Sequence, residues 1–406
     1  MAAADEEAGH PYWRRNLWVA LGGSFSTVVA MTLLLPFLPV YVSELGVTDP
    51  ADIAVWSGIA YGATFFSAAL VAPVWGRLAD RYGNKLMLIR ASLGMVVAMS
   101  LIGMAHNVYE LVALRAFAGV AGGYASGSMI LVASQTPKSR SAWALGLLSS
   151  GIMAGSLVGP LVGGLLPPLI TIRATFWLAS AVIFVAFLAT VFLIKQEHKP
   201  AATRAAAGVR FSDLENKLPV LAMMMMGALL MFATMSIEPI ITLFVQEIEP
   251  DPAKVIFIAG LAMSAAALGS IVSAPRLGRL ADRIGHWRVL IGALLVSALI
   301  LIPQALVTAP WQLVALRFLM GLALGGLMPS MTSIIRHNVP GAIVGRVLGL
   351  ATSSQYVGQV TGPLIGGLVG GHIGMRAVFI GTAGLMAAGA IFVWLVEPRK
   401  PAEKVS

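Results

Sequence analysis

The chain alternates between long apolar runs and short polar segments. Twelve of the runs have roughly the 20 residues that an α-helix needs to cross about 30 Å of hydrocarbon at about 1.5 Å per residue. They occupy residues 17–42, 54–75, 86–104, 109–133, 142–167, 174–194, 219–246, 255–275, 288–308, 310–334, 347–370 and 376–396. The first run is longer than the apolar region of a cleavable signal peptide, so we count it as a helix. The pattern predicts an all-α membrane protein with twelve transmembrane helices.

One polar stretch is much longer than the others and separates six apolar runs from the next six. It covers residues 195–218 and begins with KQEHKPAATRAAAG. We expect it to be a cytoplasmic linker between two six-helix bundles. The expected organisation is a cytoplasmic tail at 1–16, a bundle at 17–194, the linker at 195–218, a bundle at 219–396 and a cytoplasmic tail at 397–406.

Three short sequences occur twice, once in each half of the chain. GRLADRYGNKLML at 76–88 matches GRLADRIGHWRVL at 278–290, and LVALRAFAG at 111–119 matches LVALRFLMG at 313–321. GPLVGG at 159–164 matches GPLIGG at 362–367. The shifts between the copies are nearly the same, which indicates an internal duplication. The two six-helix bundles are therefore expected to be pseudo-symmetric.

Composition and charge agree with a membrane location. Hydrophobic residues make up 58% of the chain, charged residues only 11%, and the mean hydropathy is +0.86. That leaves too little polar surface to cover a water-soluble protein. A net charge of +9 would suggest nucleic acid as the partner of a soluble protein. Here, however, only Arg173, Lys254 and Arg376 fall in loops on one face of the predicted membrane, and the other basic loop and tail residues share the opposite face. The positive-inside rule then predicts both termini in the cytoplasm and no nucleic-acid partner.

The sequence gives little support to enzyme chemistry, and we expect neither a cofactor nor a bound metal. There are no cysteines, the six histidines all fall in predicted tails or loops, and no phosphate-binding P-loop is present. No set of Ser, His and Asp suggests hydrolysis. If the chain moves a substrate, the energy must come from an ion gradient.

Several motifs together resemble those of a known family. The segment Gly76–Lys85 has the Gly, Asp, Arg, Gly and basic residue of a conserved loop signature, and Arg115 with Gly119 fits a buried-arginine signature. GIMAGSLVGPLVGG at 151–164 is similar to an antiporter motif. On these residues the chain resembles the major facilitator superfamily, and within it the twelve-helix drug/proton antiporters. WRRNLWVALGG, LPFLPVYVSELGV and WSGIAYGATFF are similar to segments of bacterial inner-membrane multidrug resistance exporters. The resemblance implies export of lipophilic, often cationic drugs in exchange for protons, by a monomer that works by alternating access.

The duplicated loop is expected to act as a conformational latch, a role that the resemblance implies. Gly76 and Gly83 would allow a tight chain reversal, and Asp80 could interact with a positive helix N-terminus. Basic side chains nearby would face the anionic inner leaflet. The alternative is a solvated turn with cytoplasmic charges. The latch candidates in the two copies are Gly76, Asp80, Arg81, Gly83, Lys85, Gly278, Asp282, Arg283 and Gly285.

A stripe of small residues marks the run at 142–167. Four of its glycines recur every fourth residue, which leaves one helix face bare for close packing against another backbone. A proline in the same stretch could kink the helix. The stretch could serve a sliding or rocking helix, or it could be ordinary small-residue packing. The residues are Gly151, Gly155, Gly159, Pro160, Gly163 and Gly164.

Three charged residues fall inside predicted helices, where an unpaired charge costs several kcal/mol. They are Glu238, Arg115 and Arg317, and from their positions all three belong to roughly the same layer of the membrane. We predict that Glu238 is the proton-coupling residue and that Arg317 or Arg115 sets its affinity for protons. Glu238 could instead recognise cationic drugs without proton transfer, or be wetted at the end of its helix. Several family members carry an essential acid in the first helix, which this chain lacks.

The resemblance implies a central cavity lined by the first, fourth, seventh and tenth helices. An apolar, aromatic cavity with one acid suits lipophilic cations. The expected substrate contacts are Phe37, Tyr61, Met235, Gln355 and Gln359. Two alternatives remain open: export of sugars or lysolipids on the same scaffold, and a membrane receptor that transports nothing. Few hydrogen-bonding side chains in the cavity argue against sugars, and short loops argue against a receptor.

Overall fold

The computed structural model describes residues 10–195, 217–340 and 343–397. Every regular element in these ranges is helical, which confirms the predicted fold class. Eleven helical segments of this part of the chain are long and apolar enough to span a membrane. The twelfth, α17 (Val344–His372), has 29 residues but contains many Ser, Thr, Gln and Gly positions, and it lies between neighbouring helices. The chain is a multi-pass membrane protein. Most of the expected linker and tails lies outside the described residues.

The first half crosses the membrane region six times. Its segments are α2 (Trp13–Thr32) with η1 (Leu35–Phe37) and α3 (Leu38–Glu44), α4 (Pro50–Tyr82), α5 (Asn84–Ile102), α6 (Val108–Ala121) with α7 (Tyr124–Gln135), η2 (Lys138–Arg140) with α8 (Ser141–Leu165), and α9 (Pro167–Ile170) with α10 (Ile172–Leu193). The first helix begins at Trp13, one turn earlier than the apolar run, because charged side chains in a terminal turn can reach the polar interface.

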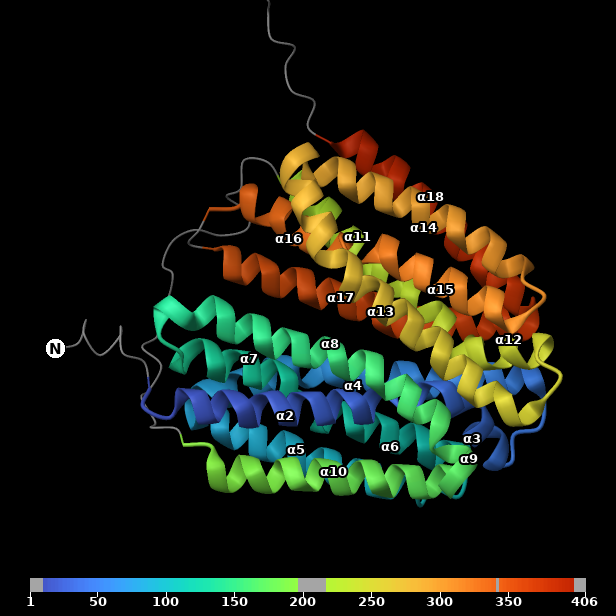
Figure 1. The fold of residues 1–406 in the computed structure, drawn as a ribbon, viewed down its shortest axis with the longest axis horizontal. Helices are drawn as coiled ribbons and strands as arrows, with labels where there is room; N and C mark the ends of the chain where they lie inside the picture. The colour runs from blue at the N-terminus through green and yellow to red at the C-terminus, as the bar shows by residue number, and fades with distance from the viewer. Residues whose placement is uncertain (1–9, 196–216, 341–342, 398–406) are drawn as a thin grey trace, which may run out of the picture.

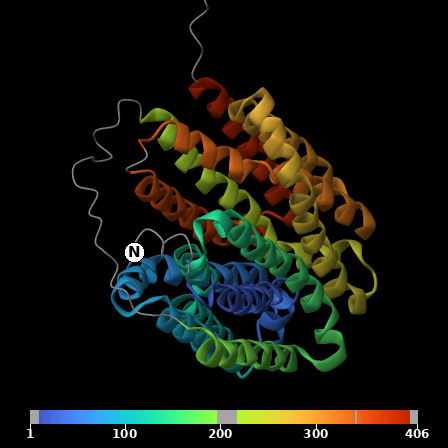
Figure 2. The same ribbon diagram turned by 60° about the vertical axis from the view of Figure 1, so that its left-hand side comes forward.

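The second half repeats this arrangement (Figures 1 and 2). Its segments are α11 (Leu218–Ile237) with η4 (Glu238–Ile240) and α12 (Ile241–Ile248), α13 (Pro252–Ile284), α14 (His286–Leu306), α15 (Pro310–Leu324) with α16 (Leu327–His337), α17, and α18 (Met375–Val396). We call the end of the molecule where α2 begins and α18 ends the terminal side, and the opposite end, with α3 and α12, the distal side.

The helices α4 and α13 show the duplication in detail. Each has 33 residues, and each begins after an aspartate whose carboxylate accepts backbone N–H groups of the first turn, Asp49 in α4 and Asp251 in α13. A 3.1 Å contact with the Lys254 ammonium also lowers the pKa of Asp251. Both helices end at a glycine with positive φ, Gly83 at 85° and Gly285 at 100°. Only glycine adopts this conformation without strain.

This geometry corrects one expectation about the duplicated loop. Residues 76–82 belong to α4 and are not part of a loop, so Gly76 takes no part in the chain reversal. The reversal is made at Gly83 alone, and α5 starts at the next residue. An amphipathic segment such as GRLADRY can continue a membrane helix into the polar interface, which hydropathy alone does not reveal.

Four membrane segments are interrupted, at matched positions in the two halves. The first and seventh segments contain a 3₁₀ turn with Pro36 or Pro239, since proline removes a helical hydrogen bond. The fourth segment breaks at Gly122 and Gly123, where Gly123 has a φ of 104°, and the tenth bends at the matched glycines, which keep near-helical angles. These four segments are the ones expected to line a central cavity.

Arg90 stabilises the break in the fourth segment. Its guanidinium donates to the carbonyl oxygens of Val120 at 2.9 Å and Gly122 at 2.8 Å, and stacks 3.7 Å from the centroid of the Trp75 ring. The milder bend of the tenth segment has glycine, Gly292, at the position that matches Arg90.

Replacing Arg90 with alanine should therefore lower the midpoint of thermal unfolding by about 5 °C, because two charge-assisted hydrogen bonds of roughly 1.5–3 kcal/mol each are lost. Thermal unfolding of the purified protein in detergent measures this. The matched control Gly292→Ala should leave the midpoint unchanged, since a Cβ there meets no atom within 4 Å. An unchanged midpoint in Arg90→Ala would contradict the proposal that Arg90 stabilises the break in the fourth segment.

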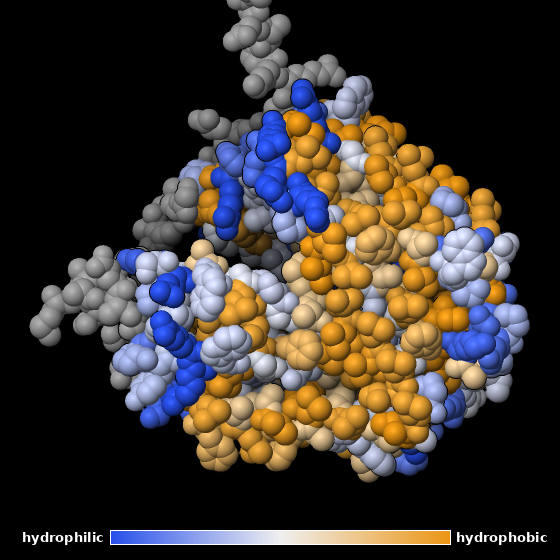
Figure 3. Space-filling view, viewed as in Figure 1, coloured by the Kyte–Doolittle hydropathy of each residue, from blue (hydrophilic) through white to orange (hydrophobic). Residues whose placement is uncertain are grey.

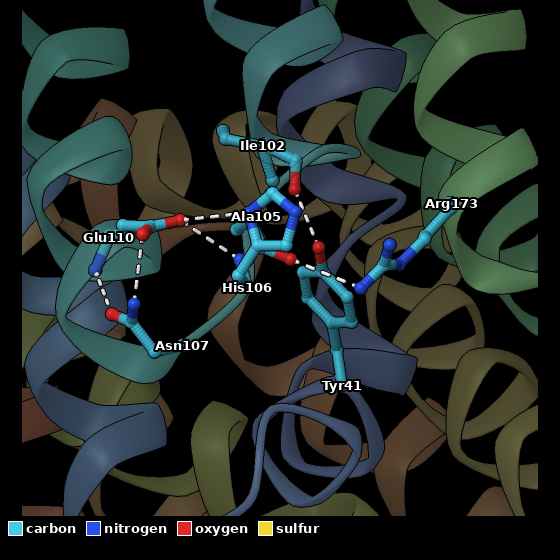
Figure 4. A network of polar contacts seen from close by, with 7 residues as sticks. All are labelled: Tyr41, Ile102, Ala105, His106, Asn107, Glu110 and Arg173. Atoms are coloured by element: carbon cyan, nitrogen blue, oxygen red, sulfur yellow. Dashed lines mark hydrogen bonds and ion pairs between the residues drawn. The ribbon is translucent and has the colours of Figure 1, made fainter.

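The distal turn between α5 and α6 is held by a polar network (Figure 4). Tyr41 donates to the Ile102 carbonyl at 2.6 Å, and Arg173 donates to the Ala105 carbonyl at 3.2 Å. Glu110 accepts from the His106 backbone at 2.9 Å and from the Asn107 side chain at 2.8 Å. These contacts join the ends of α3, α5, α6 and α10 on the distal side.

Candidate functional site

Glu238 lies at the contact between the two halves. It is the first residue of the 3₁₀ turn η4, and in the described helices it is the acidic residue farthest from any membrane-segment end. Its Oε2 atom accepts a 2.6 Å hydrogen bond from the hydroxyl of Tyr61, which belongs to α4 in the other half. The glutamate side chain is partly exposed, whereas Tyr61 is buried at 5% exposure. The bond therefore joins the two halves of the chain.

Both intramembrane arginines are buried near this pair. Arg115 is 1% exposed and its guanidinium carbon lies 5.9 Å from the centroid of the Tyr61 ring. Arg317 is 6% exposed and interacts electrostatically with Glu238, although no ion pair forms within 4.0 Å. One nitrogen of each guanidinium, Nη1 of Arg115 and Nε of Arg317, is buried without a hydrogen-bond partner. Unpaired buried donors are costly in a low-dielectric site.

The polar bonds across this interface are not duplicated. The positions that match Glu238 and Tyr61 are Leu35 and Met263, which cannot form the same bond. A second bond, from Thr242 Oγ1 of α12 to the Pro36 carbonyl at 2.8 Å, joins the seventh segment to the interruption of the first. The position that matches Thr242 is Pro39, which has no hydroxyl group to donate. The two halves therefore share their backbone geometry, but the side-chain hydrogen bonds between them occur only once.

The predicted substrate residues fall into two groups. Met235, Gln355 and Gln359 are partly buried where α11 packs against α17, and the Gln359 amide lies 3.5 Å from the Met231 sulfur. The Tyr61 hydroxyl is hydrogen-bonded to the Glu238 carboxylate. Phe37 is fully buried, with its ring 5.5 Å from that of Phe176 in an edge-on arrangement, so in this conformation it offers no surface to a ligand.

The latch candidates lie at the terminal ends of α4 and α13. Asp80 and Arg81 are exposed, as are Asp282 and Arg283. Asp80 makes no hydrogen bond or ion pair with any residue that the structure describes. Asp282 lies 3.8 Å from His286. In this conformation neither Asp80 nor Asp282 contacts a described polar group of the other half.

The small-residue stripe of α8 packs against a helix of its own half. Gly155 and Gly163 lie against backbone carbonyls of α2, those of Phe25 and Leu33, and Gly159 lies against Thr32. Gly151 faces Leu21. Gly164, by contrast, lies against α13 of the other half. The close backbone approach expected from the sequence is therefore present, mostly within one bundle.

On the distal side the halves meet through glycines, in two pairs of helices. Gly58 of α4 lies against the Pro363 carbonyl and Gly367 of α17, and Gly260 of α13 lies against the Pro160 carbonyl and Gly164 of α8. Ser264 also donates to the Leu157 carbonyl across the second pair at 2.8 Å. These contacts leave no room for a side chain, and they close the distal side.

The same four helix faces are separated on the terminal side. Each cross-half glycine has another glycine 18 residues away, which is five turns of an α-helix and thus the same face. A Cβ at any of these four would meet no atom within 4 Å; they are Gly76, Gly349, Gly146 and Gly278. Figure 3 shows a hollow between the halves on this side, bordered by hydrophilic residues, while much of the remaining surface in view is apolar. The protein is open at its terminal side and closed at its distal side.

The Tyr61–Glu238 bond is the part of the site that the sequence did not reveal. The two residues are 177 positions apart and belong to different halves, so no local pattern relates them. Tyr61 was predicted as a substrate contact, and Arg317 or Arg115 was predicted to set the proton affinity of Glu238. The bond forms only where the two halves meet on the distal side, so it becomes evident from the folded conformation and not from the sequence.

Comparison with known proteins gives consistent matches. The family model described as Major Facilitator Superfamily matches residues 20–253 and 223–406. Multidrug resistance protein MdtG from Salmonella arizonae is 42% identical over 384 residues, which cover 94% of this chain and 95% of that protein, and MdtG from Salmonella typhimurium gives the same values.

Solved structures with the same fold are more distant in sequence. A bacterial homologue of the human lysosomal transporter Spinster, in an inward-facing and occupied conformation, has a TM-score of 0.75 at 14% identity, with 95% of this chain and 97% of that chain covered. The nucleoside transporter NupG has a TM-score of 0.70 at 16% identity, with 94% and 100% covered.

Proposed function

Since the chain belongs to the major facilitator superfamily, we propose that it is a secondary active transporter that exports lipophilic, often cationic drugs in exchange for protons. The observation that carries the proposal is the Tyr61–Glu238 hydrogen bond across the halves, in a conformation that is open at one side only. The similarity to MdtG proteins, which are multidrug resistance proteins by name, supports drugs as the substrate class. We place the protein in the bacterial inner membrane as a monomer, with the terminal side in the cytoplasm.

In the conformation described here, two neighbouring groups stabilise the ionised form of Glu238 against the effect of its burial. The Tyr61 hydroxyl donates to the carboxylate, and the charge of Arg317 is close enough to stabilise it, although burial opposes ionisation. Once the neutral Glu238 has released its proton to the cytoplasmic cleft, the resulting carboxylate can accept a cationic drug from that cleft. Proton release and drug binding therefore belong to the same state.

Opening of the distal side separates α4 from η4, and the Tyr61 hydroxyl leaves the carboxylate. Glu238 then loses one interaction that favours its charge, and it becomes accessible to the proton-rich side of the membrane. Protonation removes the negative charge of Glu238 while the guanidinium group of Arg317 keeps its positive charge, so a bound cation is repelled and leaves. Proton and drug stabilise different states, as coupling requires.

The exposed carboxylates of the duplicated motif take part in the opposite state. We propose that Asp80 and Asp282 join the halves at the terminal side when that side closes, and that the surrounding basic residues keep this end at the cytoplasmic leaflet. Their exposure and lack of cross-half partners in the open state agree with such a role.

Transport by vesicles that contain the purified protein tests the proposal. With an inward-directed or outward-directed proton gradient, the wild-type chain should move ethidium against the concentration gradient of ethidium. An uncoupler should reduce this transport to the level of empty vesicles, because the vesicles contain no other energy source. A rate that does not change with the uncoupler would contradict proton coupling. No movement of ethidium or of other lipophilic cations would contradict drug export.

A further inference from the structure

A groove on the lateral surface of the first half is not used by the proposed mechanism. It runs between α2 and α10, which lie side by side (Figure 1), and encloses about 510 Å³. This volume is within the usual range of small-molecule pockets. Its lining is almost entirely apolar: Trp18, Val19, Gly22, Gly23, Ser26, Val182, Val185, Ala186 and Ala189.

The dimensions of the groove match one leaflet of a membrane. From Trp18 to Ser26 it follows α2 for eight residues, which is about 12 Å at 1.5 Å per residue. Half of the roughly 30 Å hydrocarbon core is similar. A second, smaller cavity continues the groove beyond Ser26 and Val182 towards Leu33 and Leu166. The rim residues Trp18, Val182 and Val185 are exposed, so the groove opens towards lipid.

Basic side chains stand at the terminal end of the groove. Arg15 lies one turn before Val19 of the groove, and its guanidinium carbon is 4.6 Å from the centroid of the Tyr12 ring. The guanidinium lies over the ring, and its buried Nε and Nη2 atoms have no hydrogen-bond partner among the residues that the structure describes. Donors of this kind match phosphate oxygens. The ammonium of Lys195 is 4.8 Å from the same ring.

The fold holds Lys195 at this place. The Asn16 side chain donates to the Lys195 carbonyl at 2.7 Å and accepts from the Lys195 backbone N–H at 3.1 Å. Asn16 is itself buried and also donates to Gln135 at 2.7 Å. The end of α10 is therefore fixed against the first turn of α2, which no described side chain caps. Together, the fixed lysine, the arginine and the uncapped helix turn form a cationic site next to an apolar groove.

We propose that this groove binds one anionic phospholipid, with an acyl chain between α2 and α10 and the phosphate group at Arg15 and Lys195. The charge of the site selects an anionic headgroup, and the groove selects a lipid over a soluble phosphate. The site is separate from Glu238 and does not depend on the direction or substrate of transport.

Native mass spectrometry of the full chain, released from phosphatidylcholine vesicles with or without phosphatidylglycerol, tests the proposal. Wild type should retain one tightly bound phosphatidylglycerol. Gly22→Leu should lower its occupancy about tenfold or more, because a side chain at Gly22 meets no protein atom within 4 Å and fills the groove. Arg15→Gln combined with Lys195→Gln should have a similar effect, since each basic residue contributes about 1 kcal/mol.

Two matched variants separate the groove from general effects. Gly384→Leu adds the same bulk to the exposed surface of α18, where a Cβ also meets nothing, and Arg288→Gln removes one exposed charge at the terminal side of α14. Both should retain the lipid. Equal occupancy in wild type and Gly22→Leu would overturn the proposal, as would equal retention of phosphatidylcholine. Stabilisation by inorganic phosphate alone, or displacement of the lipid by ethidium, would assign the site to another ligand.

Discussion

Glu238→Gln should abolish accumulation of drug against its gradient while leaving the fold and the closed distal side intact. Glutamine has the same shape and its carbonyl oxygen can still accept the hydrogen bond of Tyr61, but it cannot take up or release a proton. We expect gradient-driven transport to fall about 100-fold, since the interactions of a charged group are worth roughly 1.5–3 kcal/mol or more. Uptake of ethidium by vesicles under a proton gradient measures this.

A second assay separates proton coupling from drug recognition. Exchange of labelled for unlabelled drug without a proton gradient should persist in Glu238→Gln for a neutral lipophilic substrate, because exchange requires the change of conformation but no protonation. Accumulation equal to that of wild type would move the proton site elsewhere. Loss of exchange together with accumulation would assign Glu238 to binding or to the conformational change.

Leucine at Gly58 should open the distal side, and leucine at Gly76 should keep the terminal side open. A side chain at Gly58 overlaps the carbonyl of Pro363, so α4 and α17 cannot pack together in the present arrangement. Gly76 lies five turns further along the same face of α4 and meets nothing here. The same substitution is therefore tolerated in this conformation and obstructs the opposite one. Both variants should lose transport, for opposite reasons.

Cysteine labelling distinguishes the two variants, because the chain has no native cysteine. Val55 lies beside Gly367 at the distal contact. Val55→Cys should react with a thiol reagent added from the distal side about ten times faster with Gly58→Leu than without it, if that substitution shifts the equilibrium by about 1.4 kcal/mol. Gly76→Leu should leave the reaction slow. Fast labelling in both, or in neither, would contradict the role given to the glycine pairs.

The sequence predicts the fold well because the signals for it are local or periodic. Apolar length places the membrane segments, and the repeated GRLADR motif relates α4 to α13. One feature was not predicted, for a physical reason. Residues 76–82 continue a helix because long basic side chains can lie at the interface. The run at 347–370, by contrast, was predicted, and α17 occupies it although it contains many Ser, Thr, Gln and Gly residues.

The candidate site is predictable only in part. Costly intramembrane charges identify Glu238, Arg115 and Arg317 from the sequence, and the structure places Arg115 beside Tyr61 and Arg317 within electrostatic reach of Glu238. The partner of Glu238 depends on a contact between halves that exists while the distal side is closed. Phe37, which the resemblance favours as a substrate contact on a cavity-lining helix, is covered by Phe176 in this state.

The unduplicated bond between Tyr61 and Glu238 has a consequence for the energetics of transport. A pair of identical subunits would place two such carboxylates about the symmetry axis, whereas the fused and diverged chain has Leu35 at the second position. Under the proposed mechanism, Glu238 carries one proton inwards for each monovalent drug cation that leaves. This exchange is electroneutral at the site, so the pH difference drives it and the membrane voltage contributes nothing.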